Sequence, residues 1–134
     1  MEMDFKIRKG IEKDLPGIFK LIMELARYEK LLDDFQATLQ DYRKYGFSNE
    51  SIFNFLVAEN IERRGQKYLG VALYYFTFST FTGRPTLWLE DVFVPKEYRG
   101  HGIGTAFLRE LAKIALEKGC RRMEWIVLDW NKPS

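Results

Sequence analysis

The stretch from Leu87 to Leu108, LWLEDVFVPKEYRGHGIGTAFL, limits the possible folds most, because it joins a predicted strand to a predicted helix through a glycine-rich turn. The largely apolar run before Pro95 is typical of a buried strand. After the turn, apolar residues recur at helical spacing opposite charged ones, and Gly119 follows them as a C-terminal stop. A further strand is predicted from Met123, in MEWIVLDW. Strands joined through a crossover helix are normally parallel, so a parallel pair is predicted here.

The chain before this stretch is predicted to add two helices and three strands. The predicted helices span about residues 15–29 and 39–45, and the predicted strands span residues 4–8, 53–59 and 68–79. A fourth strand, residues 86–94, overlaps the start of the opening stretch. Asp14 is a candidate N-cap for the first helix, and Thr38 with Asp41 forms a candidate capping box for the second, which Gly46 is expected to stop. The resulting order, βααβββαβ, predicts one α+β domain with a mixed sheet over residues 1–134.

Composition excludes several classes of protein. With 134 residues, 46% hydrophobic and 30% charged, the chain fits one ordinary globular domain. A net charge of +2 is too small to indicate nucleic-acid binding. No apolar run reaches the roughly 20 residues that cross a bilayer, and the N-terminus lacks a signal-peptide core, so neither membrane association nor export is expected. A single cysteine and the absence of metal-ligand spacing favour a cytoplasmic protein without a metal site.

The segment from Arg99 to Gly104, RGHGIG, precedes the predicted long helix and is a candidate anion-binding turn. Its alternating glycines allow positive φ angles and close approach of a ligand, and the helix N-terminus favours an anion. The spacing does not fit a dinucleotide fingerprint, and the lysine of an NTPase phosphate loop is missing after Gly104. A tight turn that only packs the strand on the helix explains this pattern alone equally well.

Two carboxylates, Glu90 and Asp91, interrupt the apolar strand of the opening stretch. Because an unpaired buried carboxylate is costly, at least one is expected to face a cleft or a partner. Strict alternation puts Glu90 on one face with Trp88 and Val92, and Asp91 on the other with Leu89 and Phe93. Periodicity does not choose between the two carboxylates, and a salt bridge at the strand end is an alternative explanation for either.

The segment LEDVFVPKEYRGHGIGTAFL resembles the central motif of the GNAT family of N-acetyltransferases, with Arg99 to Gly104 fitting the Arg/Gln-x-x-Gly-x-Gly/Ala pattern. Further segments, in order ELARYE, YGFSNESIFNFLVAE, ALYYFTFSTFTGR and VLDWNKPS, resemble the diamine acetyltransferase branch, which contains spermidine/spermine N1-acetyltransferases and thialysine-acetylating relatives. The resemblance covers essentially the whole chain. It implies the GNAT fold, cleft binding of acetyl-CoA between two splayed parallel strands, and a homodimer.

The resemblance also implies roles for individual residues. Glu90 matches the acidic residue that removes a proton from the substrate ammonium through water, and Tyr28 and Glu29, together with Glu90, match substrate-contacting positions. The positions that match cofactor-binding ones are Val92, Phe93, Val94, Arg99, Gly100, His101, Gly102, Ile103, Gly104, Thr105, Glu124, Trp125, Ile126, Asn131, Lys132, Pro133 and Ser134.

The resemblance implies one more helix and two more strands after the Trp-Asn-x-Pro-Ser segment, with a tyrosine that protonates the departing CoA thiolate. The sequence stops at Ser134, so we expect a short form of the domain with impaired turnover. Two functions follow. One is acetyl transfer from acetyl-CoA to a primary amine of a small polyamine or diamine, or of a lysine-like amino acid. The other is a non-catalytic acetyl-CoA-binding or dimerisation module that lacks the general-acid tyrosine.

Overall fold

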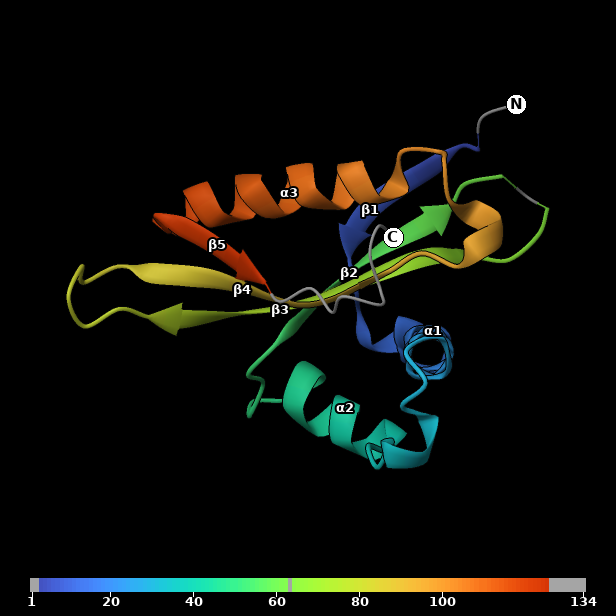
Figure 1. The fold of residues 1–134 in the computed structure, drawn as a ribbon, viewed down its shortest axis with the longest axis horizontal. Coiled ribbons are helices and arrows are strands. Elements are labelled where there is room, and N and C mark those ends of the chain that lie inside the picture. Colours follow the sequence, from blue (N-terminus) through green and yellow to red (C-terminus); the bar gives the residue numbers. More distant parts are fainter. Residues whose placement is uncertain (1–2, 63, 126–134) are drawn as a thin grey trace.

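A five-stranded mixed sheet is the centre of the computed structural model, which describes residues 3–62 and 64–125. The strands are β1 (Phe5–Lys9), β2 (Asn54–Asn60), β3 (Tyr68–Phe78), β4 (Pro85–Phe93) and β5 (Arg122–Trp125), and the helices are α1 (Leu15–Tyr28), α2 (Leu39–Phe47) and α3 (Ile103–Glu117). The strands lie in sequence order, antiparallel up to β4, and β4 and β5 are parallel. The predicted α+β fold and the order βααβββαβ are confirmed (Figure 1).

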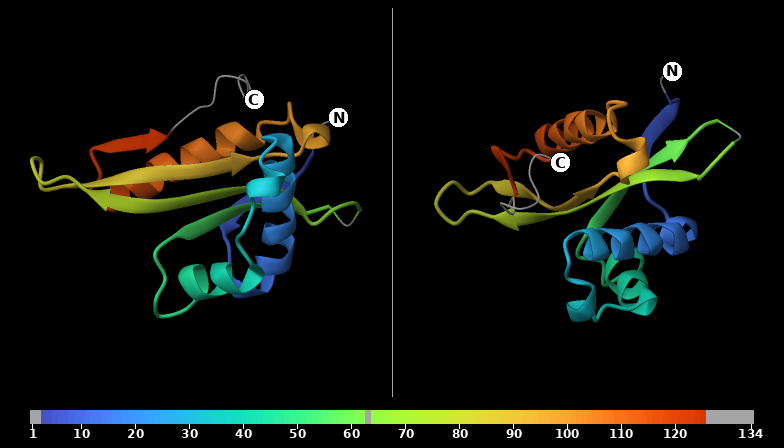
Figure 2. Two further views of the ribbon diagram at one scale, coloured as in Figure 1. Left: turned by 60° about the horizontal axis from the view of Figure 1, so that its bottom comes forward. Right: turned by 45° about the vertical axis from the view of Figure 1, so that its right-hand side comes forward.

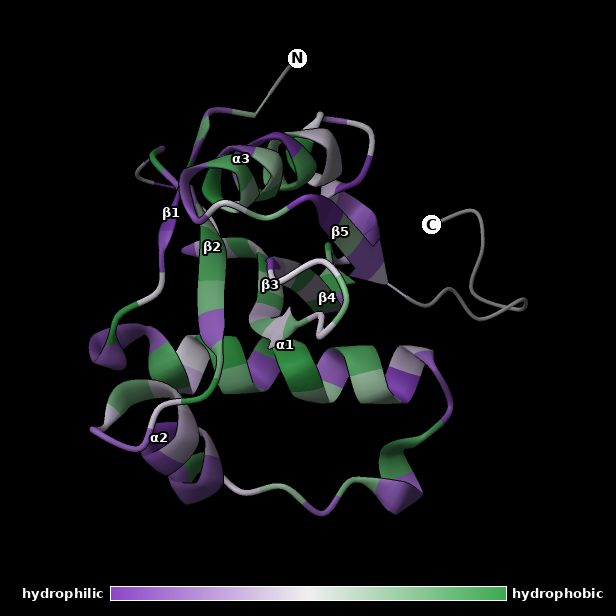
Figure 3. Cartoon of the chain, turned by 90° about the vertical axis from the view of Figure 1, so that its left-hand side faces the viewer, coloured by the Kyte–Doolittle hydropathy of each residue, from purple (hydrophilic) through white to green (hydrophobic). Residues whose placement is uncertain are grey.

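Helices cover both faces of the sheet. The apolar residues of α3 pack on one face, where Phe107 and Leu111 are fully buried against Leu56 and Leu87. The apolar residues of α1 pack on the other face against Val57 and its neighbours. Figure 3 shows α3 and α1 on opposite sides of the strands, with α2 beside α1. The long β3–β4 hairpin extends away from both helical layers (Figure 2).

The β4 strand contains a bulge at Glu90, which strict alternation did not predict. Leu73 pairs with Asp91 and the next residue, Tyr74, pairs with Leu89, so Glu90 is an extra residue without a partner on β3. A bulge reverses the faces of the residues that follow it. Leu89 therefore packs on the α3 side, whereas Phe93 packs on the α1 side. The prediction that Leu89, Asp91 and Phe93 share one face is wrong for this reason.

Asp14 is the N-cap residue of α1, as predicted, but its side chain anchors the start of the helix to the sheet. Its side chain makes no capping bond to α1 and instead accepts hydrogen bonds from Arg8 at 2.7 and 2.8 Å, Tyr68 at 2.6 Å and the Ile11 backbone at 2.8 Å. Burial opposes ionisation of this carboxyl, but these donors outweigh it and hold the pKa of Asp14 well below its usual range. The carboxylate is 2% exposed and fully partnered.

Helix α2 begins as predicted and ends differently. Thr38 and Asp41 form the expected reciprocal capping box. Gly46, the expected stop, lies inside the helix, which continues to Phe47. A Cβ at Gly46 would come within 2.6 Å of the ring of Phe53, so this glycine is needed for close packing of the helix on the aromatic side chain that follows it.

Candidate active site

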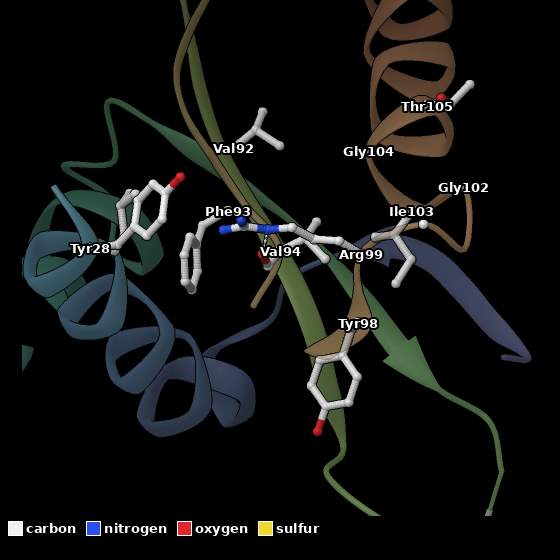
Figure 4. Close-up of a pocket in the computed structure, with 12 residues that line it drawn as sticks. Tyr28, Val92, Phe93, Val94, Tyr98, Arg99, Gly102, Ile103, Gly104 and Thr105 are labelled. Carbon is white, nitrogen blue, oxygen red and sulfur yellow. Dashed lines mark hydrogen bonds between the residues drawn. The ribbon is translucent and has the colours of Figure 1, made fainter. Parts of the chain in front are cut away.

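A cavity of about 300 Å³ opens between the C-terminal end of α1, the end of β4 and the start of α3 (Figure 4). It brings together segments far apart in the sequence. Its lining residues are Leu25, Tyr28, Val92, Phe93, Val94, Tyr98, Arg99, Gly100, Gly102, Ile103, Gly104 and Thr105. We call it the turn cavity. Most of the residues matched to cofactor positions between Val92 and Thr105 line it; His101 is half-buried in the same turn but is not part of the lining.

The glycine-rich turn presents an open backbone to the turn cavity. Gly100 and Gly102 have φ angles of +83° and +85°, which L-residues with a Cβ rarely adopt. A Cβ at either position would meet nothing within 4 Å, so the space over the turn is free. Gly102 is the N-cap of α3 and supplies no capping side chain, which leaves the first helical N–H groups available to an anion. These features fit a diphosphate group.

The edge of β4 that faces β5 is a second candidate ligand-binding feature. Pairing between β4 and β5 runs from Thr86 with Arg122 to Leu89 with Trp125, directly before the bulge. Among the residues that the structure describes, β4 beyond Leu89 has a strand partner only on its β3 side. An extended chain with amide groups can add to such an edge by backbone hydrogen bonds. The pantetheine arm of CoA has this chemistry, so Val92 to Val94 fit the group that the resemblance implies.

The side chain of Arg99 extends from the glycine turn toward α1. Its Nε donates a hydrogen bond to the Val94 carbonyl at 2.8 Å, and its guanidinium carbon lies 4.9 Å from the centre of the Tyr28 ring (Figure 4). The Tyr28 ring also packs against Phe93, with 6.4 Å between ring centroids. The structure therefore places Tyr28, which matches a substrate position, in the wall of the turn cavity.

A second cavity, of about 400 Å³, lies on the α2 side of the sheet next to the bulge. Its lining residues are Tyr42, Ile52, Phe53, Leu73, Tyr75, Glu90 and Asp91. We call it the aromatic cavity. The bulge explains why both carboxylates line it: the extra residue turns Asp91 to the same side of the strand as Glu90. The sequence left the choice between them open, and the structure brings both to one cavity.

Glu90 is exposed and is held by two neighbouring side chains. Trp88 Nε1 donates to Glu90 Oε1 at 2.9 Å, and the Tyr75 hydroxyl donates to the same oxygen at 3.3 Å. The register of the sheet explains this arrangement, because Tyr75 and Trp88 are directly paired across β3 and β4. The carboxylate of the predicted base is thus oriented while it remains accessible to water.

Asp91 is half-buried, in contrast to Glu90. Burial, with the negative charges of Glu90 and then Glu29, raises the pKa of Asp91 to about 6. Burial also raises the pKa of Glu29, at the end of α1. The hydroxyl of Tyr42 faces the same acidic environment, and burial together with Asp91, Asp41 and Glu90 raises its pKa to about 12. The region around the bulge therefore carries a concentrated negative potential.

The remaining predicted cofactor residues lie elsewhere or outside the described chain. Glu124 and Trp125 lie on β5 beside Trp88 and Met123, in a shallow hollow separate from the turn cavity. Glu124 also forms an ion pair with Arg122 at 3.3 Å. Ile126 and the positions Asn131, Lys132, Pro133 and Ser134 lie outside the described residues.

The sequence alone did not identify the aromatic side chains that line the aromatic cavity. Phe53 and Tyr42 belong to an aromatic cluster of the core, with 6.0 Å between their centroids. Two signals could have identified Tyr75. Alternation along β3 puts it on the same face as Leu73, and the hairpin register puts it beside Trp88.

Two kinds of feature are absent from the described residues, 3–62 and 64–125. They contain no group of three or more His, Cys, Asp or Glu side chains that could hold a metal ion. Within the same residues, no helix has the length and apolar character needed to cross a membrane.

Comparison with known proteins adds relatives of known activity. Thialysine N-epsilon-acetyltransferase of Sus scrofa is 44% identical over 132 residues, which are 96% of this chain and 77% of that protein. The Mus musculus enzyme of the same name is 43% identical and covers 96% of this chain and 78% of its own. Spermidine/spermine N(1)-acetyltransferase-like protein 1 of Homo sapiens is 38% identical over 97% of this chain and 19% of its own.

Solved structures show the same fold. An aminoglycoside acetyltransferase from an uncultured soil metagenomic sample, in complex with sisomicin, superposes with a TM-score of 0.77 over 96% of this chain and 80% of its own, at 20% identity. An integron cassette protein from the mobile metagenome of V. cholerae gives 0.72 over 96% and 78%, at 31% identity. The sequence model described as acetyltransferase (GNAT) family matches residues 16–134. This chain therefore belongs to the GNAT family of acetyltransferases.

Proposed function

We propose that this chain transfers an acetyl group from acetyl-CoA to a primary amine of a small diamine or polyamine, or of a lysine-like amino acid. The observation that carries the proposal is the position of the bulge. It puts Glu90 and Asp91 in the aromatic cavity, while the next residues of the same strand, Val92 to Val94, line the turn cavity. A donor in one cavity and an acceptor in the other would meet at a single point of β4. The relatives that act on thialysine support an amine acceptor.

The turn cavity is proposed to hold acetyl-CoA, which supplies the acetyl thioester when bound. The backbone N–H groups at the start of α3 and the open turn at Gly100 and Gly102 would bind the diphosphate. The edge of β4 from Val92 to Val94, which has no partner on the β5 side among residues 3–62 and 64–125, would pair with the pantetheine arm. A backbone N–H near Val92 would then polarise the thioester carbonyl as negative charge develops on its oxygen.

Glu90 is proposed as the general base. An alkylamine is protonated at neutral pH and cannot attack a thioester until it loses that proton. The hydrogen bonds from Trp88 and Tyr75 fix one carboxylate oxygen of Glu90, and the exposure of the side chain allows a water to carry the proton. Glu90 would also attract the substrate cation before it deprotonates it.

Thiol release from acetyl-CoA, measured with spermidine, thialysine and lysine, tests the proposal. Glu90→Gln should lower kcat by about a hundredfold while the acetyl-CoA Kd changes by less than about twofold. Glu117→Gln, at the exposed end of α3 outside both cavities, is the matched control and should leave both values unchanged. If acetyl-CoA binds and no amine is acetylated, the non-catalytic binding module becomes the correct description. Lost cofactor affinity with unchanged turnover would exclude Glu90 as base.

A further inference from the structure

The end of α1 lies in an unfavourable environment. Glu29, the C-cap of the helix, is half-buried, and its negative charge acts on Asp91 in the aromatic cavity. Like charges repel, and burial disfavours the charged form of Glu29. Lys30, the next residue, has a φ of 61°, in the left-handed region that a residue with a Cβ rarely adopts. The helix end therefore stays beside the bulge only if other contacts hold it.

Arg99 supplies such a contact from the glycine turn. Its Nε donates a hydrogen bond to the Val94 carbonyl at 2.8 Å, and its guanidinium carbon lies 4.9 Å from the centre of the Tyr28 ring. A guanidinium is attracted to a ring face, and its planar shape lets it stack on the ring while it keeps a hydrogen bond. Figure 4 shows the Arg99 side chain reaching across Val94 toward Tyr28 on α1. We call this contact of Arg99 with Val94 and Tyr28 the arginine bridge.

The arginine bridge joins three elements at one place. Arg99 is half-buried, and among the described residues that line the turn cavity it is the only charged one. Tyr28, which directly precedes Glu29, also packs against Phe93 with 6.4 Å between ring centroids. The end of α1, the end of β4 and the glycine turn therefore meet through a small set of side chains. A ligand that orders Arg99 would also order the end of α1.

We propose that Arg99 is a positioning residue that ties the end of α1 to the glycine turn, so that acetyl-CoA in the turn cavity holds Glu29 in place beside the bulge. This inference rests on the proposed function for the identity of the donor. The diphosphate would bind the turn in which Arg99 lies, and the pantetheine arm would pair with the strand edge at Val94, so the donor fixes both anchor points of the side chain. Two ligands affect each other only through an element that both bias. Donor binding should therefore prepare the acceptor side.

Hydrogen exchange at the end of α1 tests the arginine bridge without turnover. The backbone N–H groups of Glu29, Lys30 and Leu31 bond to carbonyls near the end of the helix, so their exchange rates report whether that end is closed. Saturating CoA, which carries no acetyl group, should slow their exchange by about fivefold or more in the wild-type protein. Arg99→Gln, saturated with CoA, should lose most of this protection. A purely structural contact would protect these amides equally with and without CoA.

Variants on α1 and elsewhere complete the test. Tyr28→Leu removes the other half of the arginine bridge and alters no residue of the glycine turn, so it should lose the same protection even if Arg99→Gln binds CoA too weakly to be saturated. In the double variant the two losses should not add, because each breaks the same contact. Lys118→Gln is the matched control: it removes a cation 5.8 Å from the centre of the Phe76 ring, outside both cavities, and should keep the wild-type protection.

Steady-state kinetics separates this inference from the proposed function. With saturating acetyl-CoA, Arg99→Gln should raise the KM of thialysine or spermidine by about fivefold and change kcat by less than about twofold. If neither amine is acetylated but CoA protects the end of α1 through Arg99, the proposed function fails and the arginine bridge stands. If an amine is acetylated and both single variants keep the CoA-dependent protection, the role of Arg99 is refuted. Absence of that protection in the wild-type protein would also refute it.

Discussion

Two sheltered aspartates show how the same residue type can serve opposite purposes. Asp14 is surrounded by donors, and its pKa is held well below the usual range. Asp91 is surrounded by carboxylates and rings, and its pKa is raised. The first arrangement stabilises the fold, and the second destabilises it unless a cation is bound. The sequence alone does not distinguish them, because Tyr68 beside Asp14 and the rings of the aromatic cavity beside Asp91 come from distant segments.

Asp14→Asn should lower the free energy of unfolding by about 3 kcal/mol near neutral pH, since it leaves the Arg8 guanidinium without its buried partner. The folded-state pKa of Asp14 is depressed, so its contribution is present above about pH 4 and is lost as pH falls further. Urea denaturation of the wild-type protein and of Asp14→Asn at about pH 7 and pH 3 measures the difference in their free energies of unfolding. A difference in stability that is equally large at the lower pH would contradict the depressed folded-state pKa of Asp14.

Asp91→Asn should have the opposite effect on stability. The folded-state pKa of about 6 lies above the ordinary 3.8, so the folded state binds the proton more tightly. Wild-type stability should fall as pH rises from about 4 to about 6 and then stay lower. The variant lacks this fall and should be more stable by about 1 to 3 kcal/mol near pH 7.5, with little difference near pH 4. Denaturation curves at the two pH values measure the change in stability caused by Asp91→Asn. A variant that is less stable than the wild type at the higher pH would contradict the raised pKa of Asp91.

At the scale of elements, sequence patterns predicted regular segments well and one irregularity poorly. Apolar spacing predicted a helix between the glycine turn and Gly119, where α3 spans Ile103–Glu117, and the capping box predicted the start of α2. The extra residue at Glu90 could not be predicted, because a bulge depends on the pairing partner and leaves no periodic signal in its own strand. The side on which Asp91 and Phe93 lie followed from that single residue.

The glycine turn and α3 allow a matched comparison of two glycines. Gly102 before the helix and Gly119 after it both have positive φ, +85° and +80°, and both face open space. Alanine at either position should cost about 1 to 2 kcal/mol of stability because of backbone strain. Only Gly102→Ala should also weaken acetyl-CoA binding, by about tenfold or more, since its methyl group occupies the anion site. Equal acetyl-CoA affinities in the two variants would show that the diphosphate does not bind at this turn.

Considered as a whole, the molecule places its two cavities along consecutive residues of one strand, and neither cysteine, serine nor lysine is among the described residues that line them. The sole cysteine, Cys120, is buried in the α3-side core and lines neither cavity. Donor and acceptor should therefore be bound together, without an acyl-enzyme intermediate. Initial rates should give intersecting double-reciprocal plots, and Cys120→Ala should keep at least about half of the wild-type kcat. Parallel plots, or loss of burst-phase product in Cys120→Ala, would show a covalent route instead.

The overall architecture could be predicted from the sequence, whereas the proposed acceptor site could be predicted only in part. The order of elements and the glycine turn are local features, and each has a local pattern. The aromatic cavity is assembled from α2, the residues before β2, and strands β3 and β4, which only the fold brings together. Tyr42 and Phe53 looked like core residues because they are also core residues, packed against Phe55 at 6.1 and 5.3 Å.

The bulge also has a consequence for how this protein could diversify. Because of the bulge, some residues of β4 line the turn cavity together with α3 and the glycine turn. The others line the aromatic cavity together with α2 and the residues before β2. Side chains at Tyr42, Ile52 and Phe53 can therefore change without touching the turn cavity. Substitutions at these three positions of the aromatic cavity would change which acceptor is used and would leave binding of the donor unchanged. Under the proposed function, this one extra residue lets the donor site and the acceptor site change independently during evolution.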